Sequence, residues 1–434
     1  MQHAQNIHAD QDDLAVIGKL IANAKQAMAQ ILSANQDRVD EAVTALCWAI
    51  YKPENARETA KLAVAGTGLG NVEDKIVKNQ RKNFGTLRDL LRVKTVGIIE
   101  KLPERGLVKY AKPVGVVGAV VPSTNPCATP VNKAMMAIKG RNAVIIAPSP
   151  AGLQATGRTV ELMRSELEKI GLPANLVQIL PGPISKNLTN TLMQECDLVV
   201  VTGSQNNVRN AYKSGTPAIG VGAGNVPVII DASADLNDAA RKIMASKCFD
   251  NATSCSSENS VTIQDSIYEE AIDALTRVGG YMCTNDDKQK ILDHLWVDGH
   301  LNRHALAKDP DVFADVCGLP VAAKQAKFFM IEDTGAGPEK PLSGEKLSLA
   351  LTVYRVPDIE AAISQVKDVL KYQGMGHSVG IHTKTIKNAE LLAERLDVVR
   401  VLVNQAHTFG NGGSFNNGLG FTLTMGCGTW AGNS

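Results

Sequence analysis

Between residues 114 and 231, short and wholly apolar runs alternate with stretches that have helical spacing. The helical stretches fall at about 151–170, 184–196 and 204–214. Strands that are apolar throughout need cover on both faces, and helical crossovers of a parallel sheet provide that cover. The pattern therefore predicts a doubly wound α/β architecture of the nucleotide-binding type, with its strands in VGVVGAVVP, AVIIAPS, LVQILPG, LVVVTGS and VPVIID.

A second α/β series, at about 241–411, follows the first, with SVTI, KFFMIED, LALTVYRV, SVGIHT and VVRVLVN as its strands. Before both series, residues 12–92 have helical spacing, and residues 94–111 have the composition of a β-hairpin. We therefore expect an α/β fold of two doubly wound domains. A helical layer and dinucleotide-binding domain would occupy 1–240 and a second domain 241–411, and 412–434 would return toward the cleft or an oligomer interface.

Composition narrows the partners and the compartment. Lys and Arg total 45 against 44 Asp and Glu, so no overall field attracts nucleic acid. The eight cysteines form no C-x-x-C pair and no disulfide framework. The sequence has no apolar run of membrane-spanning length and no export signal. We therefore expect a small-molecule partner, no metal site and a cytoplasmic location.

Cys255 stands in CFDNATSCSSENS, among small polar residues where a structural cysteine would have apolar neighbours. A thiol in such a setting can reach the thiolate form and attack a carbonyl group. An inert surface or interface cysteine is the alternative. Cys248, seven residues earlier, fits a helix core.

Two loops at predicted strand ends carry further candidates. Asn125 precedes Pro126, a position that excludes helix and presents the amide from a loop, where it can donate to an oxyanion or bond its own backbone. Thr202, Gly203 and Ser204 lie between a strand and a helix, where free N–H groups suit a pyrophosphate. Plain connection chemistry would also explain this turn.

These motifs together resemble a CoA-acylating aldehyde dehydrogenase. The resemblance runs from about residue 12 to the end and rests on STNP, VTGS, GVGAGNVPVII, SCSSE, GEKLS and the Gly-rich tail from residue 410. It implies a nucleotide domain, a catalytic domain and an oligomerisation arm, in a homodimer or homotetramer. It also implies that Cys255 attacks the aldehyde, that Asn125 and the Cys255 N–H hold the oxyanion, and that a thioester forms on Cys255.

The same resemblance implies a cofactor site and an exit for the acyl group. Hydrolytic members have a Glu at the position of Val221, so its absence here favours transfer to coenzyme A. Gly222 and Gly224 would line the cofactor site, and Glu345 matches the acid on the nicotinamide ribose. APSP replaces the usual K-P-x-E segment, which favours NADP bound at Pro148 and Ser149, with NAD as the alternative.

Other residues are open to two interpretations. His377 either assists proton movement from the CoA thiol or is a structural histidine. Lys75, Lys78 and Lys82 share one helix face with Arg81 beside it, and form either a solvated surface or a site for an anionic substrate group. Ser256 and Ser414 would add hydrogen-bond donors to that site.

The resemblance favours a short anionic aldehyde, with sulfoacetaldehyde first, succinate semialdehyde second and acetaldehyde third. A hydrolytic aldehyde dehydrogenase is the enzymatic alternative, and the absence of Glu at Val221 argues against it. A catalytically inactive scaffold of the same fold is the alternative from another class, and the presence of Cys255 and Asn125 argues against that.

Overall fold

The structure is a computed structural model that describes residues 11–425. Its first four helices form the predicted N-terminal layer. Pro53 begins the third helix, where its missing N–H has no cost, and Gly68 ends it in the left-handed conformation. The four are α1 (Gln11–Ile31), α2 (Gln36–Tyr51), α3 (Pro53–Thr67) and α4 (Val72–Leu91).

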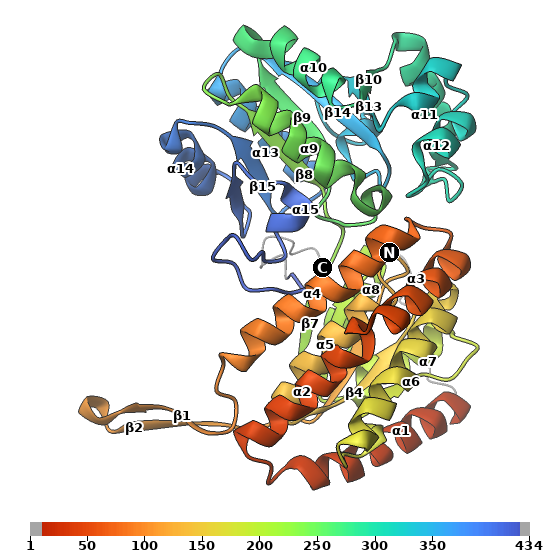
Figure 1. Cartoon of the computed structure of the whole chain (residues 1–434), viewed down its shortest axis with the longest axis vertical. Coiled ribbons are helices and arrows are strands. Elements are labelled where there is room, and N and C mark those ends of the chain that lie inside the picture. The colour runs from red at the N-terminus through yellow and green to blue at the C-terminus, as the bar shows by residue number, and fades with distance from the viewer. Residues whose placement is uncertain (1–10, 426–434) are drawn as a thin grey trace, which may run out of the picture.

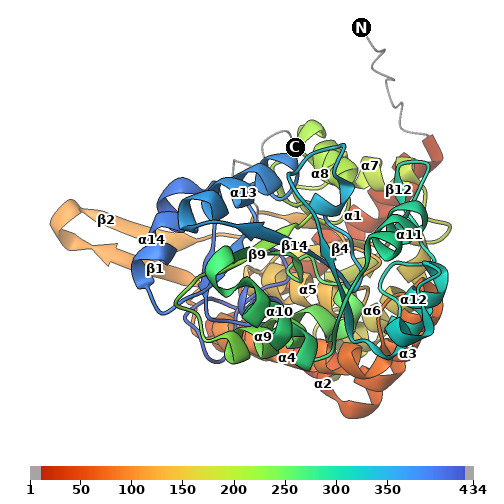
Figure 2. The ribbon, with the colours of Figure 1, turned by 90° about the horizontal axis from the view of Figure 1, so that it is seen from above.

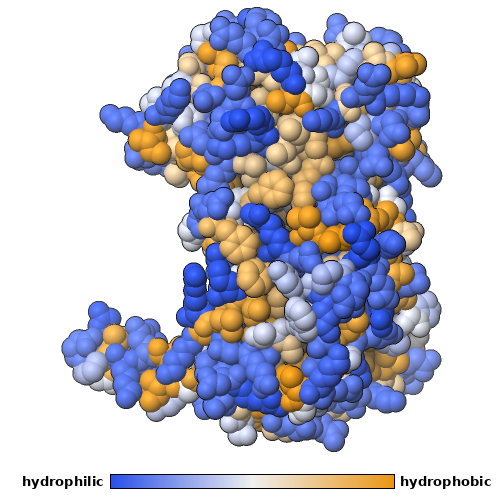
Figure 3. All heavy atoms as spheres, viewed as in Figure 1, coloured by the Kyte–Doolittle hydropathy of each residue, from blue (hydrophilic) through white to orange (hydrophobic). Residues whose placement is uncertain are grey.

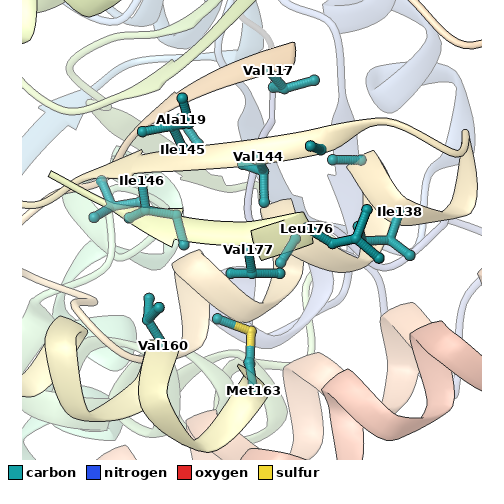
Figure 4. Close-up of a cluster of buried hydrophobic side chains, with 14 of the residues drawn as sticks. Val117, Ala119, Ile138, Val144, Ile145, Ile146, Val160, Met163, Leu176 and Val177 are labelled. Atoms are coloured by element: carbon teal, nitrogen blue, oxygen red, sulfur yellow. The ribbon is translucent and has the colours of Figure 1, made fainter. Parts of the chain in front are cut away.

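A five-stranded parallel sheet forms the core of the first α/β unit (Figure 1). Its order is β5-β4-β3-β6-β7, with β3 (Val116–Val120), β4 (Ala143–Ala147), β5 (Val177–Ile179), β6 (Leu198–Thr202) and β7 (Ala218–Val221). One face packs on α5 (Ala128–Lys139) and α6 (Leu153–Lys169), and α1, α7 (Lys186–Glu195) and α8 (Gln205–Lys213) cover the other. Figure 4 shows this core, where Val144 from β4 and Val177 from β5 point toward α6, which carries Met163, and Ile145 lies on the other side of β4 near Ala119.

One strand was assigned to the wrong sheet. The run VPVIID forms β8 (Val226–Ile230), which pairs with strands of the second sheet and not with the first. The fifth strand of the first sheet is β7, which the sequence analysis missed. Residues 222–225 contain two glycines and no helical crossover, so the chain passes directly from one sheet to the other. Apolar composition cannot reveal that crossing, because strands of both sheets are equally apolar.

The second unit is a seven-stranded parallel sheet of order β10-β13-β14-β9-β8-β15-β16. Every strand predicted for this region is present. The additional strands are β10 in this sheet and the antiparallel pair of β11 (Trp296–Val297) and β12 (His300–Leu301) outside it. The further strands are β9 (Glu258–Gln264), β10 (Gly280–Met282), β13 (Phe328–Glu332), β14 (Ala350–Val356), β15 (Val379–His382) and β16 (Val401–Val403). The helices around it include α9 (Leu236–Cys248), α10 (Tyr268–Arg277), α11 (Asn285–Leu295), α12 (Pro310–Val316), α13 (Ile359–Tyr372), α14 (Ile386–Arg395) and α15 (His407–Gly410). The α/β fold class predicted from the sequence is confirmed.

Two segments leave these units. The predicted hairpin, β1 (Gly97–Leu102) paired antiparallel with β2 (Leu107–Ala111), projects from the body (Figures 1 and 2). Residues 412–425 return to α4, where Phe421 N donates to Asp89 Oδ2 at 2.7 Å. The rest of the predicted C-terminal segment, including Cys427, lies outside the described residues. Within 11–425, no helix is both long and apolar enough to cross a membrane.

The two units stack with α4 between them, so that α4 touches the second unit at η4 (Phe249–Ala252) (Figure 1). On the face shown in Figure 3, apolar side chains gather where the units meet, and polar ones cover the outer ends. The segment that carries Cys255 begins at this junction.

Candidate active site

The chain reaches Cys255 through a strained turn. Asp250, Asn251 and Ala252 have φ values of 51°, 51° and 60°, a left-handed conformation that residues with a Cβ rarely adopt. Each such residue costs on the order of 1–3 kcal/mol and persists only where surrounding contacts hold it. The Cys255 loop therefore needs anchors outside its own sequence.

Those anchors come from α4. The fully buried carboxylate of Asp250 lies 3.0 Å from Lys75 Nζ and 2.6 Å from Lys78 Nζ, and it accepts from Thr253 Oγ1 at 2.6 Å. Burial raises the pKa of Asp250, but the two ammonium groups outweigh burial and hold that pKa below its ordinary value. Asn71 N donates to the same carboxylate at 3.0 Å.

The network also reaches the loop that carries Asn125. Lys75 Nζ donates to the carbonyl of Thr124 at 3.2 Å, so the nucleophile loop and the amide loop share one anchor. Asn125 is half-buried, and its Oδ1 has no hydrogen-bond partner among residues 11–425. Oδ1 can only accept, so an oxyanion would be bound by the Nδ2 donor of the same amide.

Cys255 itself is half-buried, is not part of a disulfide, and touches the loop between the sheets. A Cβ added at Gly224 would lie 2.2 Å from the carbonyl oxygen of Cys255 and 2.6 Å from its Cβ. Only glycine permits this approach. The crossing between the sheets is therefore packed directly on the candidate nucleophile.

The other two cations on this face of α4, Arg81 and Lys82, have a different environment. Neither Arg81 nor Lys82 forms an ion pair with a described acidic residue, although Lys82 is only 8% exposed. Lys82 Nζ makes long contacts of 3.5 and 3.4 Å to the carbonyls of Gly412 and Gly413. Burial, with Arg81 and Lys78 nearby, lowers the pKa of Lys82 to about 7, and charge on the Cys255 thiol opposes that shift.

Aromatic rings support the Arg81 guanidinium, which lies 5.8 Å from the ring centroid of Phe409 and 5.5 Å from that of Phe415. Its Nε is buried without a partner in the described chain. The solvated-surface interpretation of this face of α4 is therefore wrong, because Lys75, Lys78 and Lys82 are all buried.

The two predicted serine donors lie in this region but already have partners. Ser256 Oγ is 2.8 Å from Ser254 Oγ, and Ser414 Oγ accepts from Asn416 N at 3.3 Å. Both serines are buried. Asn411 was missed by the sequence analysis, although its side-chain oxygen and nitrogen are both buried without described partners.

The predicted phosphate turn is present at the end of β6. Thr202 Oγ1 is buried with no partner in the described chain, which fits a bound hydroxyl or phosphate oxygen. The N–H of Gly203 is not free as expected, because it donates to Val221 O at 3.3 Å. Ser204 is the N-cap of α8, and its Oγ accepts from Asn207 N at 3.3 Å. The space beside Gly203 is open, since a Cβ there would meet only Asn207 Nδ2, at 3.6 Å.

Three other predicted cofactor positions lie at neighbouring strand ends. Pro148 and Ser149 follow β4, and Ser149 Oγ accepts from Gly152 N at 3.1 Å while its own hydroxyl proton stays available. Gly222 follows β7 and has the side chain of Gln205 against it. Carboxyl ends of parallel strands meet at one edge of a sheet, where α/β proteins bind ligands.

Glu345 also approaches the crossing loop. Burial raises its pKa to about 8, although a hydrogen bond from the Gly224 backbone and the charges of Lys346 and Lys247 act in the opposite direction. The group is therefore largely protonated at neutral pH and can donate to a hydroxyl group. These positions together fit a dinucleotide.

His377 is buried and pairs with its neighbour, since Nδ1 lies 2.8 Å from Ser378 Oγ. Burial, with the charge of Arg400 next, lowers the pKa of His377 to about 4, so the ring is neutral. Its Nε2 has no partner in the described residues. This unbonded nitrogen would be available for proton transfer, a property that His377 shares with His382 and His407, whose Nδ1 atoms are also buried without described partners.

Asp250, which holds the nucleophile loop, was not among the residues predicted from the sequence. The sequence contained two signals for this ion pair. One was the acid five positions before Cys255 in CFDNATSC, and the other was the group of cations at residues 75–82. Pairing the two required the fold, because Asp250 is separated from Lys75 by 175 positions.

Comparisons with known proteins identify the family of this chain. A family model described as "Aldehyde dehydrogenase family" matches residues 8–287. A sulfoacetaldehyde dehydrogenase (acylating) from Cupriavidus necator is 50% identical over 419 residues, covering 96% of this chain and 85% of that one. Another protein of that name, from Bilophila wadsworthia, is 41% identical over 416 residues, 95% and 89% of the two chains.

Among solved structures, an acetylating aldehyde dehydrogenase from Geobacillus thermoglucosidasius has a TM-score of 0.93 at 35% identity. The match covers 96% of this chain and 92% of that one. The chain therefore belongs to the aldehyde dehydrogenase family, among its acylating members.

Proposed function

We propose that this enzyme oxidises sulfoacetaldehyde to the corresponding CoA thioester, with NADP as the hydride acceptor. The pair of Arg81 and Lys82 carries this proposal. It places two cationic groups without acidic partners in the described chain, with Lys82 close enough to Cys255 for their charges to interact. A sulfonate has one permanent negative charge and three acceptor oxygens, so it could accept hydrogen bonds from both groups.

Cys255 begins the reaction in this proposal. Its thiolate attacks the aldehyde carbon, a C–S bond forms, and the carbonyl electrons move to oxygen. The Asn125 amide and the Cys255 backbone N–H donate to that oxyanion. The Asp250 network supports the step because it fixes both loops to α4.

A nicotinamide dinucleotide, when bound, would supply the hydride acceptor, and loss of hydride from the thiohemiacetal would leave a thioester on Cys255. Thr202, Ser204 and Glu345 would hold the dinucleotide. Between residues 147 and 150 no acid stands to repel a 2′-phosphate, and Ser149 retains a hydroxyl donor, which favours NADP over NAD. A solved glycolyl-CoA reductase, an engineered variant 25% identical to this chain, has bound NADP+.

Transfer to coenzyme A completes the cycle. Val221 is a buried aliphatic residue at the end of β7, so it cannot activate water at the position where hydrolytic members have Glu. His377 would accept the CoA proton. A propionaldehyde dehydrogenase from Rhodopseudomonas palustris, 25% identical, has been solved with propionyl-CoA.

Succinate semialdehyde is the second candidate substrate, since its carboxylate would meet the same two cations. A succinate-semialdehyde dehydrogenase (acetylating) from Clostridium kluyveri is 39% identical over 419 residues. Acetaldehyde ranks third because it has no charge for Arg81 and Lys82 to bind.

We further propose a cytoplasmic homo-oligomer, a dimer or a tetramer. Four large apolar side chains of the hairpin are exposed, and a neighbouring copy would cover them: Ile99, Leu107, Val108 and Tyr110.

The direct test measures NADP reduction with each of the three aldehydes, with and without CoA. The expected result is CoA-dependent turnover that is fastest with sulfoacetaldehyde. Equal multiple turnover without CoA would refute acyl transfer, and preference for another aldehyde would refute the substrate alone. Cys255→Ala should remove turnover and keep the fold, whereas a protein without any turnover would match the scaffold alternative.

A further inference from the structure

Three buried side chains form a hydrogen-bonded chain beside the active site. His377 Nδ1 lies 2.8 Å from Ser378 Oγ, and Ser378 Oγ lies 2.8 Å from His407 Nε2. The three residues are 2%, 0% and 1% exposed. Ser378 directly precedes β15, and His407 begins α15, so the chain joins two elements of the second unit.

The chain sets the proton positions of both imidazoles. Each neutral ring carries one N–H, and the single serine proton can go to only one ring. In one arrangement His377 donates from Nδ1 to Ser378, Ser378 donates to His407, and Nε2 of His377 keeps its lone pair. In the other, Nε2 carries the proton and cannot act as a base.

We propose that Ser378 and His407 are positioning residues that hold His377 with its proton on Nδ1 and its lone pair on Nε2. Nε2 of His377 and Nδ1 of His407 are both buried without partners in the described residues, so each arrangement leaves one unbonded N–H. Only the first arrangement gives His377 the Nε2 lone pair that a base requires. The inference rests on the proposed transfer to CoA, in which His377 accepts a proton.

The packing around His377 connects this turn to the nucleophile. His377 N donates to Gly374 O at 3.0 Å, and a Cβ added at Gly374 would lie 2.9 Å from Cβ of Asn225. Asn225 follows Gly224, which contacts Cys255. The two loops are therefore in contact through residues 224–225.

Transfer of the acyl group from Cys255 to CoA moves one proton to His377. The S–H bond of CoA breaks, its proton bonds to Nε2 of His377, and its electron pair stays on sulfur. That sulfur bonds to the acyl carbon, and the C–S bond to Cys255 breaks, so Cys255 leaves as a thiolate. No further oxidant is needed, because the hydride has already left.

Pre-steady-state kinetics separates this role from a structural one. Without CoA, the burst of NADPH reports acylation of Cys255, and with CoA, steady-state kcat reports transfer. Ser378→Ala and His407→Phe should leave the burst rate within about twofold of the unmodified enzyme and lower kcat on the order of tenfold or more. Ser378→Thr, which keeps the hydroxyl, should restore most of that loss.

His382→Gln is the matched control, because His382 is a buried histidine of β15 outside the hydrogen-bonded chain. It should change neither burst nor kcat. ¹⁵N NMR of the His377 ring should report a proton on Nδ1 in the unmodified protein and its loss from that site in Ser378→Ala.

Three outcomes would overturn the inference: a proton on Nε2 in the unmodified protein, equal loss of burst and turnover in Ser378→Ala, or turnover of Ser378→Ala equal to that of the unmodified enzyme. Failure of the proposed function is a separate result, since the unmodified enzyme would then show no CoA-dependent turnover. Full transfer activity in His377→Ala would likewise refute the role of His377 before its neighbours are tested.

Discussion

The two halves of the cationic face of α4 have the same sequence pattern and opposite environments. Lys75 and Lys78 share the carboxylate of Asp250 in a buried ion-pair network. Arg81 and Lys82, one turn further along, have no acidic partner among the described residues and meet carbonyls and aromatic rings. The first half is paired with one shared carboxylate, and the second half has no described acid that would compete with an anionic ligand.

One helix can therefore hold the nucleophile loop with two of its cations and offer the other two to a ligand. Breaking a buried pair leaves an uncompensated charge and is strongly destabilising. A cation kept without a partner costs stability too, and this cost is recovered only when an anion binds. Lys75 and Lys78 therefore should matter for every aldehyde, and Arg81 and Lys82 only for anionic ones.

The largest expected effect follows from Asp250→Ala. The substitution leaves two buried ammonium groups unpaired and removes the anchor of a left-handed turn, so we expect a loss of roughly 3–5 kcal/mol in the free energy of unfolding. Urea denaturation measures it. Asp265→Ala, which removes an exposed partner of Arg355, is the control and should change stability by less than about 1 kcal/mol. Equal losses would remove the distinction between buried and exposed pairs.

Lys82→Met should act on specificity. Losing one charge-assisted hydrogen bond, worth about 1.5–3 kcal/mol, should lower kcat/KM for sulfoacetaldehyde about 10-fold to 100-fold and leave acetaldehyde unchanged. Steady-state kinetics with both aldehydes measures the ratio. Lys78→Met should instead lower both activities together, and the comparison fails if the two variants behave alike.

The pH dependence of that ratio tests the charge on Lys82 directly. Its pKa is lowered from 10.5 to about 7, so the empty site loses its ammonium charge as pH rises through 7. The preference for sulfoacetaldehyde over acetaldehyde should therefore fall by up to about tenfold per pH unit above that value. The ratio cancels titrations common to both substrates, and a flat ratio from pH 6 to 9 would contradict the assignment.

The same shift affects stability with the opposite sign. Between pH 7 and 10.5 the unfolded chain binds the Lys82 proton and the folded protein does not, so this residue's contribution to stability rises with pH. Lys82→Met should remove this rise, which thermal unfolding at several pH values would detect.

The smallest effect is expected for Arg81→Lys. The charge stays, but the planar guanidinium between Phe409 and Phe415 is lost, so kcat/KM for sulfoacetaldehyde should fall about 3-fold to 10-fold. Arg88→Lys is the control, since Arg88 has Asp89 as its partner. A larger effect at Arg88 would place the substrate elsewhere.

Much of the fold was predictable from local patterns. Wholly apolar runs mark β3, β4 and β6, because a buried parallel strand admits no polar face. β7 was missed because its run AIGV is short and contains glycine. The exchange of β8 between sheets was hidden because an apolar strand fits either sheet.

The site was predictable to the extent that chemistry is local. Cys255 and Asn125 are conspicuous because their neighbours are small, polar or proline. Ser378 and His407 were not found, because a serine–histidine bond across 29 positions has no local sequence signal.

Helical spacing is set by the backbone, so the sequence alone places four cations close together on one helix: Lys75, Lys78, Arg81 and Lys82. Which of these charges meet an acid depends on the long-range fold. Asp250 arrives from 172 positions beyond Lys78, and no acid arrives at Lys82 from the described chain. The energy of a charge depends on the distance to other charges and on the local dielectric constant, and both are set by contacts between residues far apart in the sequence.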